Sequence, residues 1–416
     1  MSGEVVLDDT FVNTTLMPVS TGLGGVLFRQ APNWKLRKGL KDSIGQCLRL
    51  FDEHHGISGS RAIPPEYVTE RKLFITGLTI LGGKLNLEDL TKIMEPVIET
   101  DWKAHVELNK EKRYRDHITH PVRVTAIGWW LIHAGSGRVM KKLERHYQDK
   151  MAHGAVPKEF RRQKLCWQAI VEYAWLACGL LHDVGFPLEY HLRSGRRLDE
   201  RYGKLHSVLP PATGTRTLKA RKEIERLLEP LEIPWSECGE SGLGERLKDL
   251  FAGRGFKHSH ALLSPLLFAG AINDDPTRII QKLALQLAAR AIVTHHDSKD
   301  NGILSDPLAT LLFVADNIQG WQRSFLHKEG ARIGLRRTIR PIVECLSIRL
   351  EPARGGYQAI FEMNMEERRT LKKEPYGWDF DKFCEPNRRV ERLIQVQGFL
   401  PRIILSEKNC LEPPDF

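Results

Sequence analysis

The chain has 416 residues, which is more than one hydrophobic core ordinarily needs, so two or three structural regions are expected. Its 41% hydrophobic and 27% charged residues are typical of a soluble globular protein, and no stretch has the uninterrupted apolar length of a membrane span. The formal net charge of +10 suits phosphate-bearing partners without identifying one.

The N-terminal sequence "MSGEVVLDDTFVNTTLMPV" has no basic segment, and it has acidic residues where a signal peptide would be apolar. The seven cysteines are scattered and form no CxxC pair. This usage indicates reduced thiols and argues against both a disulfide framework and a thiolate zinc site. We therefore expect a cytoplasmic protein that does not associate with membranes.

Residues 1–100 are predicted to form an N-terminal mixed, mostly helical region, with helix candidates in "NWKLRKGLKDSIGQCLRLFDEHH" and "NLEDLTKIMEPVIETDW". From about 101 to 325 the helical period dominates, which predicts a mainly α fold built around a helical bundle. Within it, residues 193–257 are rich in Arg, Lys, Gly and Pro and interrupt two apolar helical blocks. We interpret them as a basic insertion, either a solvated decoration or an arm that binds a partner.

Four apolar helices are predicted in the bundle region. The first, "HPVRVTAIGWWLIHAG", is expected to end at Gly135, and "QKLCWQAIVEYAWLACGLLHD" is apolar nearly all round, as a central helix should be. "TRIIQKLALQLAARAIVTHHD" has the same character. The last, "SDPLATLLFVADNIQGW", is expected to start at Ser305 or Asp306, with Pro307 in its first turn, and to stop at Gly320.

After about residue 330 the pattern changes. "VECLSIRLEPARGGYQAIFEMNM" predicts two strands around a Gly-Gly turn, and "VQGFLPRIILSE" predicts another strand. Residues 330–416 are therefore predicted to form a small α+β C-terminal region.

Histidine and aspartate residues recur on these apolar helices and at their ends. An ionised carboxylate among apolar residues, such as Asp316 in "LLFVADNIQ", must be paired, bound to a metal, or protonated. Divalent metal ions would satisfy all of these groups at once, with neutral imidazoles and carboxylates as ligands. The residues concerned are His120, His182, Asp183, His260, His295 and Asp316.

In this order and local context the residues resemble the HD-domain superfamily of metal-dependent phosphohydrolases, in its variant with additional histidine ligands. "HPVRVTA" is similar to that family's first-ligand helix, and "LLHDVGFP" is similar to its namesake motif. "HALLSPLL" resembles the third-ligand segment, and the closing segment runs from "AIVTHH" to "LLFVADNIQGWQR". The likeness covers roughly residues 101–325 and implies an HD-type helical core.

The resemblance also implies roles for these residues. His120, His182, Asp183 and Asp316 would hold one metal ion, with Asp183 bridging to a second ion held by His260 and His295. Asp183 and His295 are the residues expected to be catalytic. Three assignments stay open, because His117 competes with His120, His258 competes with His260, and His296 can replace or join His295.

We expect one or two divalent ions (Mn, Fe, Ni, Co, Mg or Zn) and a metal-activated water that cleaves a phosphoester of a nucleotide or cyclic nucleotide. The residues expected to orient the substrate are Arg115, His117, Lys257 and Arg323, and Trp321 is placed to stack on a base. The alternatives are an HD-type nuclease on single-stranded DNA or RNA, a di-iron oxygenase and a signalling module. Association into a homo-oligomer is compatible with the sequence.

Overall fold

The computed structural model describes five long helices, six strands and the turns that adjoin the helices. The described residues are 5–6, 15, 119–153, 166–186, 188–189, 260–269, 279–295, 306–318, 325–326, 338–339, 344–353, 356–364 and 402–408. Most of the predicted N-terminal region and the whole basic insertion of residues 193–257 lie outside these ranges, so the predictions made for them stay predictions.

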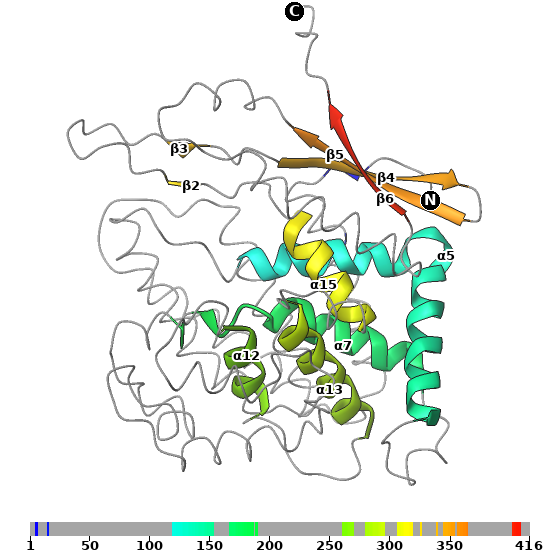
Figure 1. Ribbon diagram of the computed structural model, residues 1–416, viewed down its shortest axis with the longest axis vertical. Coiled ribbons are helices and arrows are strands. Elements are labelled where there is room, and N and C mark those ends of the chain that lie inside the picture. Colours follow the sequence, from blue (N-terminus) through cyan, green and yellow to red (C-terminus); the bar gives the residue numbers. More distant parts are fainter. Residues whose placement is uncertain are drawn as a thin grey trace, which may run out of the picture.

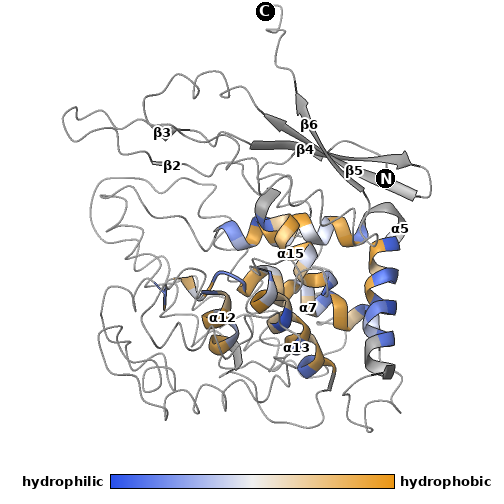
Figure 2. Ribbon diagram, in the orientation of Figure 1, coloured by the Kyte–Doolittle hydropathy of each residue, from blue (hydrophilic) through white to orange (hydrophobic). Residues whose placement is uncertain are grey.

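Helix α7 (Trp167–Leu181) is the centre of the bundle (Figure 1). It packs against α5 (Thr119–His153) and α13 (Ile279–Thr294). Helix α12 (His260–Ala269) packs against α13, and α15 (Pro307–Ile318) packs against α5, α7 and α13. Hydrophobic residues dominate α7, α12 and α13 (Figure 2), in keeping with the prediction that the apolar segments form the core. A mainly α fold fits this arrangement.

Helices α5 and α7 approach each other closely because glycines lie at their contact. A Cβ atom on Gly128 of α5 would lie 1.8 Å from the Trp175 ring, and one on Gly179 of α7 would lie 2.5 Å from Thr125 Oγ1. The Trp175 indole Nε1 donates a hydrogen bond of 3.0 Å to the carbonyl oxygen of Thr125, which fixes the ring in this contact. The pairing of α5 with α7 therefore depends on glycine at both positions.

The prediction that the first apolar helix ends at Gly135 is wrong. Helix α5 continues to His153 and changes direction near Gly137, where φ is +69° (Figure 1). Its second arm continues as a helix because it is amphipathic and buries one face, formed by Val139, Met140, Leu143 and Tyr147.

Helix α15 begins as expected of its sequence. The Asp306 carboxylate accepts hydrogen bonds from the backbone N–H groups of Leu308 (3.0 Å) and Ala309 (3.2 Å), so Asp306 and not Ser305 is the N-cap. The same carboxylate accepts a hydrogen bond from Tyr147 Oη of α5 (2.8 Å) and lies 3.2 Å from Arg290 Nε of α13. This buried cap therefore joins three helices.

Four strands form one sheet in the order β1-β4-β5-β6. Strands β4 (Glu344–Ala353) and β5 (Gly356–Asn364) are antiparallel and meet at the Ala353–Gly356 pair, β6 (Arg402–Lys408) runs parallel to β5, and β1 (Val5–Val6) pairs with β4. These strands fall in the segments predicted as strands, with β1 added from the N-terminal end of the chain. The helical part of the predicted α+β C-terminal region lies outside the described residues.

Two short strands, β2 (Phe325–Leu326) and β3 (Thr338–Ile339), form a separate antiparallel pair.

Among the described helices, none combines the length and apolar character that crossing a bilayer requires.

Candidate metal centre

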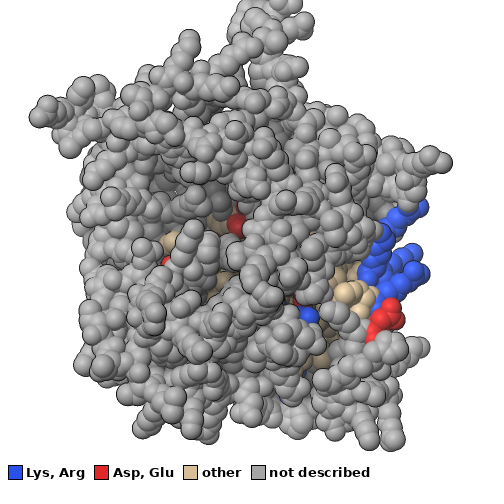
Figure 3. All heavy atoms as spheres, in the orientation of Figure 1, with Lys and Arg blue, Asp and Glu red and all other residues tan. Residues whose placement is uncertain are grey.

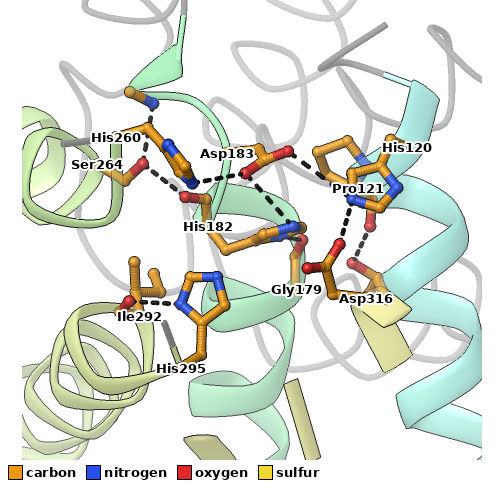
Figure 4. Close-up of polar contacts among 12 residues, drawn as sticks. His120, Pro121, Gly179, His182, Asp183, His260, Ser264, Ile292, His295 and Asp316 are labelled. Carbon is orange, nitrogen blue, oxygen red and sulfur yellow. Dashed lines mark hydrogen bonds and ion pairs between the residues drawn. The ribbon is translucent and has the colours of Figure 1, made fainter. Parts of the chain in front are cut away.

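Six side chains from five helices converge at one end of the bundle (Figure 4). His120 lies in the first turn of α5, and His182 and Asp183 directly follow α7. His260 is the first residue of α12, His295 directly follows α13, and Asp316 lies in the last turn of α15. The helix ends thus deliver residues that are up to 196 positions apart in the sequence to one place.

Asp183 is the common neighbour of three imidazoles. Its Oδ2 lies 3.7 Å from His120 Nε2, and its Oδ1 lies 3.7 Å from His182 Nε2 and 3.6 Å from His260 Nε2. The second carboxylate, Asp316, contacts His120 Nε2 through Oδ1 at 2.8 Å. Ligand atoms of His120, His182 and Asp183 all lie within 4.8 Å of one another, and this buried group could hold a metal ion.

The imidazoles are oriented through their Nδ1 atoms. His182 Nδ1 lies 2.9 Å from the carbonyl oxygen of Gly179, and His295 Nδ1 lies 2.5 Å from that of Ile292. A carbonyl oxygen only accepts hydrogen bonds, so each of these Nδ1 atoms carries the proton and each Nε2 keeps its lone pair. This is the tautomer in which a histidine binds a metal through Nε2.

His295 is completely buried and packs edge-on against His182, with ring centroids 5.8 Å apart. Burial and, less strongly, the neighbouring His182 lower the pKa of His295 to about 3, against opposing effects of Asp316 and the Ile292 carbonyl. His295 is therefore neutral at physiological pH, as a metal-binding imidazole must be.

His260 is held differently. Its Nδ1 lies 3.1 Å from Oε2 of Glu189, and its backbone N–H donates to the same oxygen at 2.9 Å. Burial lowers the pKa of His260, but the Glu189 hydrogen bond and the charges of Asp183, Glu189 and Asp316 outweigh burial, so the pKa is raised overall.

The turn after α7 brings the His182–Asp183 pair against α12. Ser264 Oγ donates to the carbonyl oxygen of His182 at 2.7 Å and accepts from the backbone N–H of Gly185 at 2.8 Å. A Cβ atom on Gly185 would lie 2.6 Å from the Ser264 backbone nitrogen and 2.7 Å from the His260 carbonyl oxygen, so this close turn requires glycine.

The donor set fits a divalent metal ion. Nε2 of His182 is buried and has no hydrogen-bond partner within the part of the chain that the structure describes, although it faces the Asp183 carboxylate. Directing the lone pair of His182 Nε2 toward the Asp183 carboxylate is unfavourable unless a cation lies between them. Mixed nitrogen and oxygen ligands suit several transition-metal ions, so the donor set does not select one ion.

The six predicted metal ligands are all described, and the structure brings them together. The competing His117, His258 and His296 lie outside the described residues, as do Trp321 and the predicted substrate-binding residues Arg115, His117, Lys257 and Arg323. Sequence reasoning missed Glu189 and assigned no role to Ser264. The available signal for Glu189 was an acidic side chain next to Leu188, soon after the "HD" pair.

Comparisons of this chain with protein-family models, with curated proteins and with solved structures found no match.

Proposed function

We propose that this protein is a metal-dependent phosphohydrolase with an HD-type site. The observation that carries the proposal is the orientation of the imidazoles, because His120, His182 and His260 direct Nε2 toward one shared carboxylate. Histidines that only pack in a core would not need to direct their Nε2 atoms toward one carboxylate. The order of the ligand segments along the chain is the order that the family resemblance implies.

In this proposal Asp183 would bridge two ions, because its Oδ2 lies near His120, which contacts Asp316, and its Oδ1 lies near His260. His182 Nε2 also lies near Oδ1, and it is assigned to the first ion because the ligand atoms of His120, His182 and Asp183 lie within 4.8 Å of one another. The first ion would be held by His120, His182, Asp183 and Asp316, and the second by Asp183, His260 and His295. When bound, such ions lower the pKa of a coordinated water and offset charge on phosphate oxygens.

The substrate that we propose is a phosphoester of a nucleotide or cyclic nucleotide. The net charge of +10 favours an anionic substrate. Arg115, His117, Lys257 and Arg323 remain the residues proposed to bind its phosphate groups, and Trp321 the residue proposed to stack on its base.

A nuclease acting on single-stranded DNA or RNA is the second candidate, and a basic stripe on α5 favours it. Arg138, Lys141, Lys142 and Arg145 are exposed and follow helical spacing on the second arm, where Figure 3 shows Lys and Arg side chains gathered at the surface. Such a stripe suits the regular phosphates of a polynucleotide backbone. A nuclease would use the same metal centre.

The test is metal analysis of the purified protein followed by an activity screen in the absence of oxygen. Nucleotides, cyclic nucleotides and single-stranded oligonucleotides are incubated with protein reloaded with Mn, Co, Ni or Mg, and products are separated by chromatography. We expect bound metal and phosphoester cleavage of at least one nucleotide class. Oligonucleotide cleavage alone would favour the nuclease, and turnover that requires iron and dioxygen without phosphoester cleavage would exclude both.

A further inference from the structure

We propose that Glu189 positions His260 for binding a second metal ion, so that Glu189 determines whether the site holds one ion or two. This inference rests on the proposed metal centre and names a residue that neither the motif spacing nor the family resemblance assigned. Glu189 contacts both the ring and the backbone N–H of His260, so we assign it as a positioning residue that acts through His260.

The contact between Glu189 and His260 is buried and has two parts. Oε2 of Glu189 accepts the backbone N–H of His260 at 2.9 Å and lies 3.1 Å from Nδ1 of its ring, and Glu189 is only 3% exposed. An ionised carboxylate only accepts hydrogen bonds, so Nδ1 carries the proton. Nε2 then presents its lone pair to the opposite side, where Asp183 Oδ1 lies 3.6 Å away.

His260 is held differently from two other imidazoles of the cluster. His182 and His295 follow complete helices, and each anchors Nδ1 on the carbonyl oxygen three residues earlier, at Gly179 and Ile292. His260 is the first described residue of α12, and its Nδ1 contacts the Glu189 carboxylate from another segment of the chain. The same carboxylate also accepts the backbone N–H of His260 at the start of the helix.

The effect of removing Glu189 should be confined to one of the two ions. The proposed first-ion ligands His120, His182 and Asp316 are oriented by contacts that do not involve Glu189. Loss of the residue that orients a metal-binding histidine typically weakens metal affinity by about 10–100-fold. We expect that loss for the second ion and no change for the first.

The experiment is titration of the chelator-treated full-length protein with Mn²⁺ and Co²⁺. Calorimetry gives the stoichiometry and both affinities, and the electronic absorption of Co²⁺ reports the coordination of each ion. The variants are Glu189→Ala, Glu189→Gln, His260→Ala and the double variant Glu189→Ala/His260→Ala. Asp306→Asn is the matched control, because it alters another buried carboxylate that caps a helix, at the start of the helix that carries Asp316.

The parent protein should bind two ions. Glu189→Ala should weaken the second by about 10–100-fold, and Glu189→Gln by less, because its carbonyl oxygen still accepts a hydrogen bond. His260→Ala should lose the second ion, and the double variant should match it, because in this proposal Glu189 acts through His260. Asp306→Asn should lower stability and leave both affinities unchanged. If Glu189→Ala does not fold, the test rests on Glu189→Gln. A lower affinity of Glu189→Gln for the second ion, with an unchanged affinity for the first, supports the proposal.

Equal affinities in the parent and in the folded Glu189 variants would overturn the inference and leave the proposed function intact. A parent that binds two ions with the predicted variant pattern, but cleaves no phosphoester, would refute the proposed function and support the inference. A parent that binds no ion would refute both.

Discussion

The two carboxylate oxygens of Asp183 face three imidazoles, so we expect substitution of Asp183 to impair the site more than substitution of any other ligand. Replacing Asp183 with Ala should abolish phosphoester cleavage and weaken metal binding by more than the about 10–100-fold that follows loss of a supporting residue. The helices should persist, because their packing rests on apolar contacts. Activity, metal content and circular dichroism measure these effects, with Asp149→Ala, an exposed aspartate on α5, as the control. Unchanged turnover in Asp183→Ala would contradict the proposed HD-type site.

His295 should make the metal-free protein sensitive to acid. Its folded-state pKa of about 3 lies below its ordinary value of 6.5, so the unfolded chain binds the proton more readily. Its contribution to stability is therefore complete above pH 6.5 and is lost as the pH falls toward 3. Burial is the largest cause of the lowered pKa, His182 and His260 lower it as well, and Asp316 and the Ile292 carbonyl raise it.

Urea unfolding of chelator-treated protein between about pH 7 and about pH 4 measures this effect. The free energy of unfolding of the parent should fall more steeply than that of His295→Gln. The pKa of His260 is raised, so the stability that His260 contributes is complete at low pH and is lost as the pH rises. This effect is present in both proteins and therefore cancels in the comparison. A difference between the two proteins that stays constant across this range would refute the assignment to His295.

At the scale of the helices, the site depends on where each helix ends. His182 and His295 follow the last turns of α7 and α13, and His260 opens α12. The side chains can meet only if the helices pack at fixed separation and register. The contact of α5 with α7 also sets His120 beside His182, with ring centroids 5.3 Å apart.

Gly128→Ala should disrupt this contact. The new Cβ would lie 1.8 Å from the Trp175 ring, which is buried and held by its hydrogen bond to Thr125. We expect a loss of about 1–3 kcal/mol in the free energy of unfolding, and weaker metal binding because His120 moves away from His182. Chemical denaturation and metal titration measure the two effects. Adding Trp175→Phe to Gly128→Ala should recover part of the lost stability, because the smaller ring leaves room for the new Cβ. If the losses in the free energy of unfolding of the two single variants simply add in the double variant, the clash is not their cause.

For the molecule as a whole, bound metal should act as a cross-link between five helices. An ion that binds only the folded state stabilises it by mass action, by about 2.7 kcal/mol at one hundred times the dissociation constant. Chelation should therefore lower the melting temperature, and added Mn²⁺ or Co²⁺ should restore it in a concentration-dependent way. Thermal unfolding followed by circular dichroism measures this, and Asp183→Ala should not respond. Identical melting curves with and without chelator would contradict a metal centre.

The sequence by itself determined the helices of the core and the order of the candidate ligands. The apolar character of α7 and α13 predicted central helices, and Asp306 followed by Pro307 predicted the start of α15, because local backbone chemistry decides both features. The cost of burying Asp183 and Asp316 pointed to a shared cation before any geometry was known.

Only the tertiary structure decided the rest, because those features depend on contacts between distant segments. Helix α5 continues past Gly135 because its second arm buries an apolar face, which a local glycine signal does not reveal. Glu189 acquires a role only because α12 begins beside it, 71 residues later in the chain. The meeting of His120 with Asp316 across 196 residues is likewise a result of helix packing, since no local pattern records the distance between two helix ends.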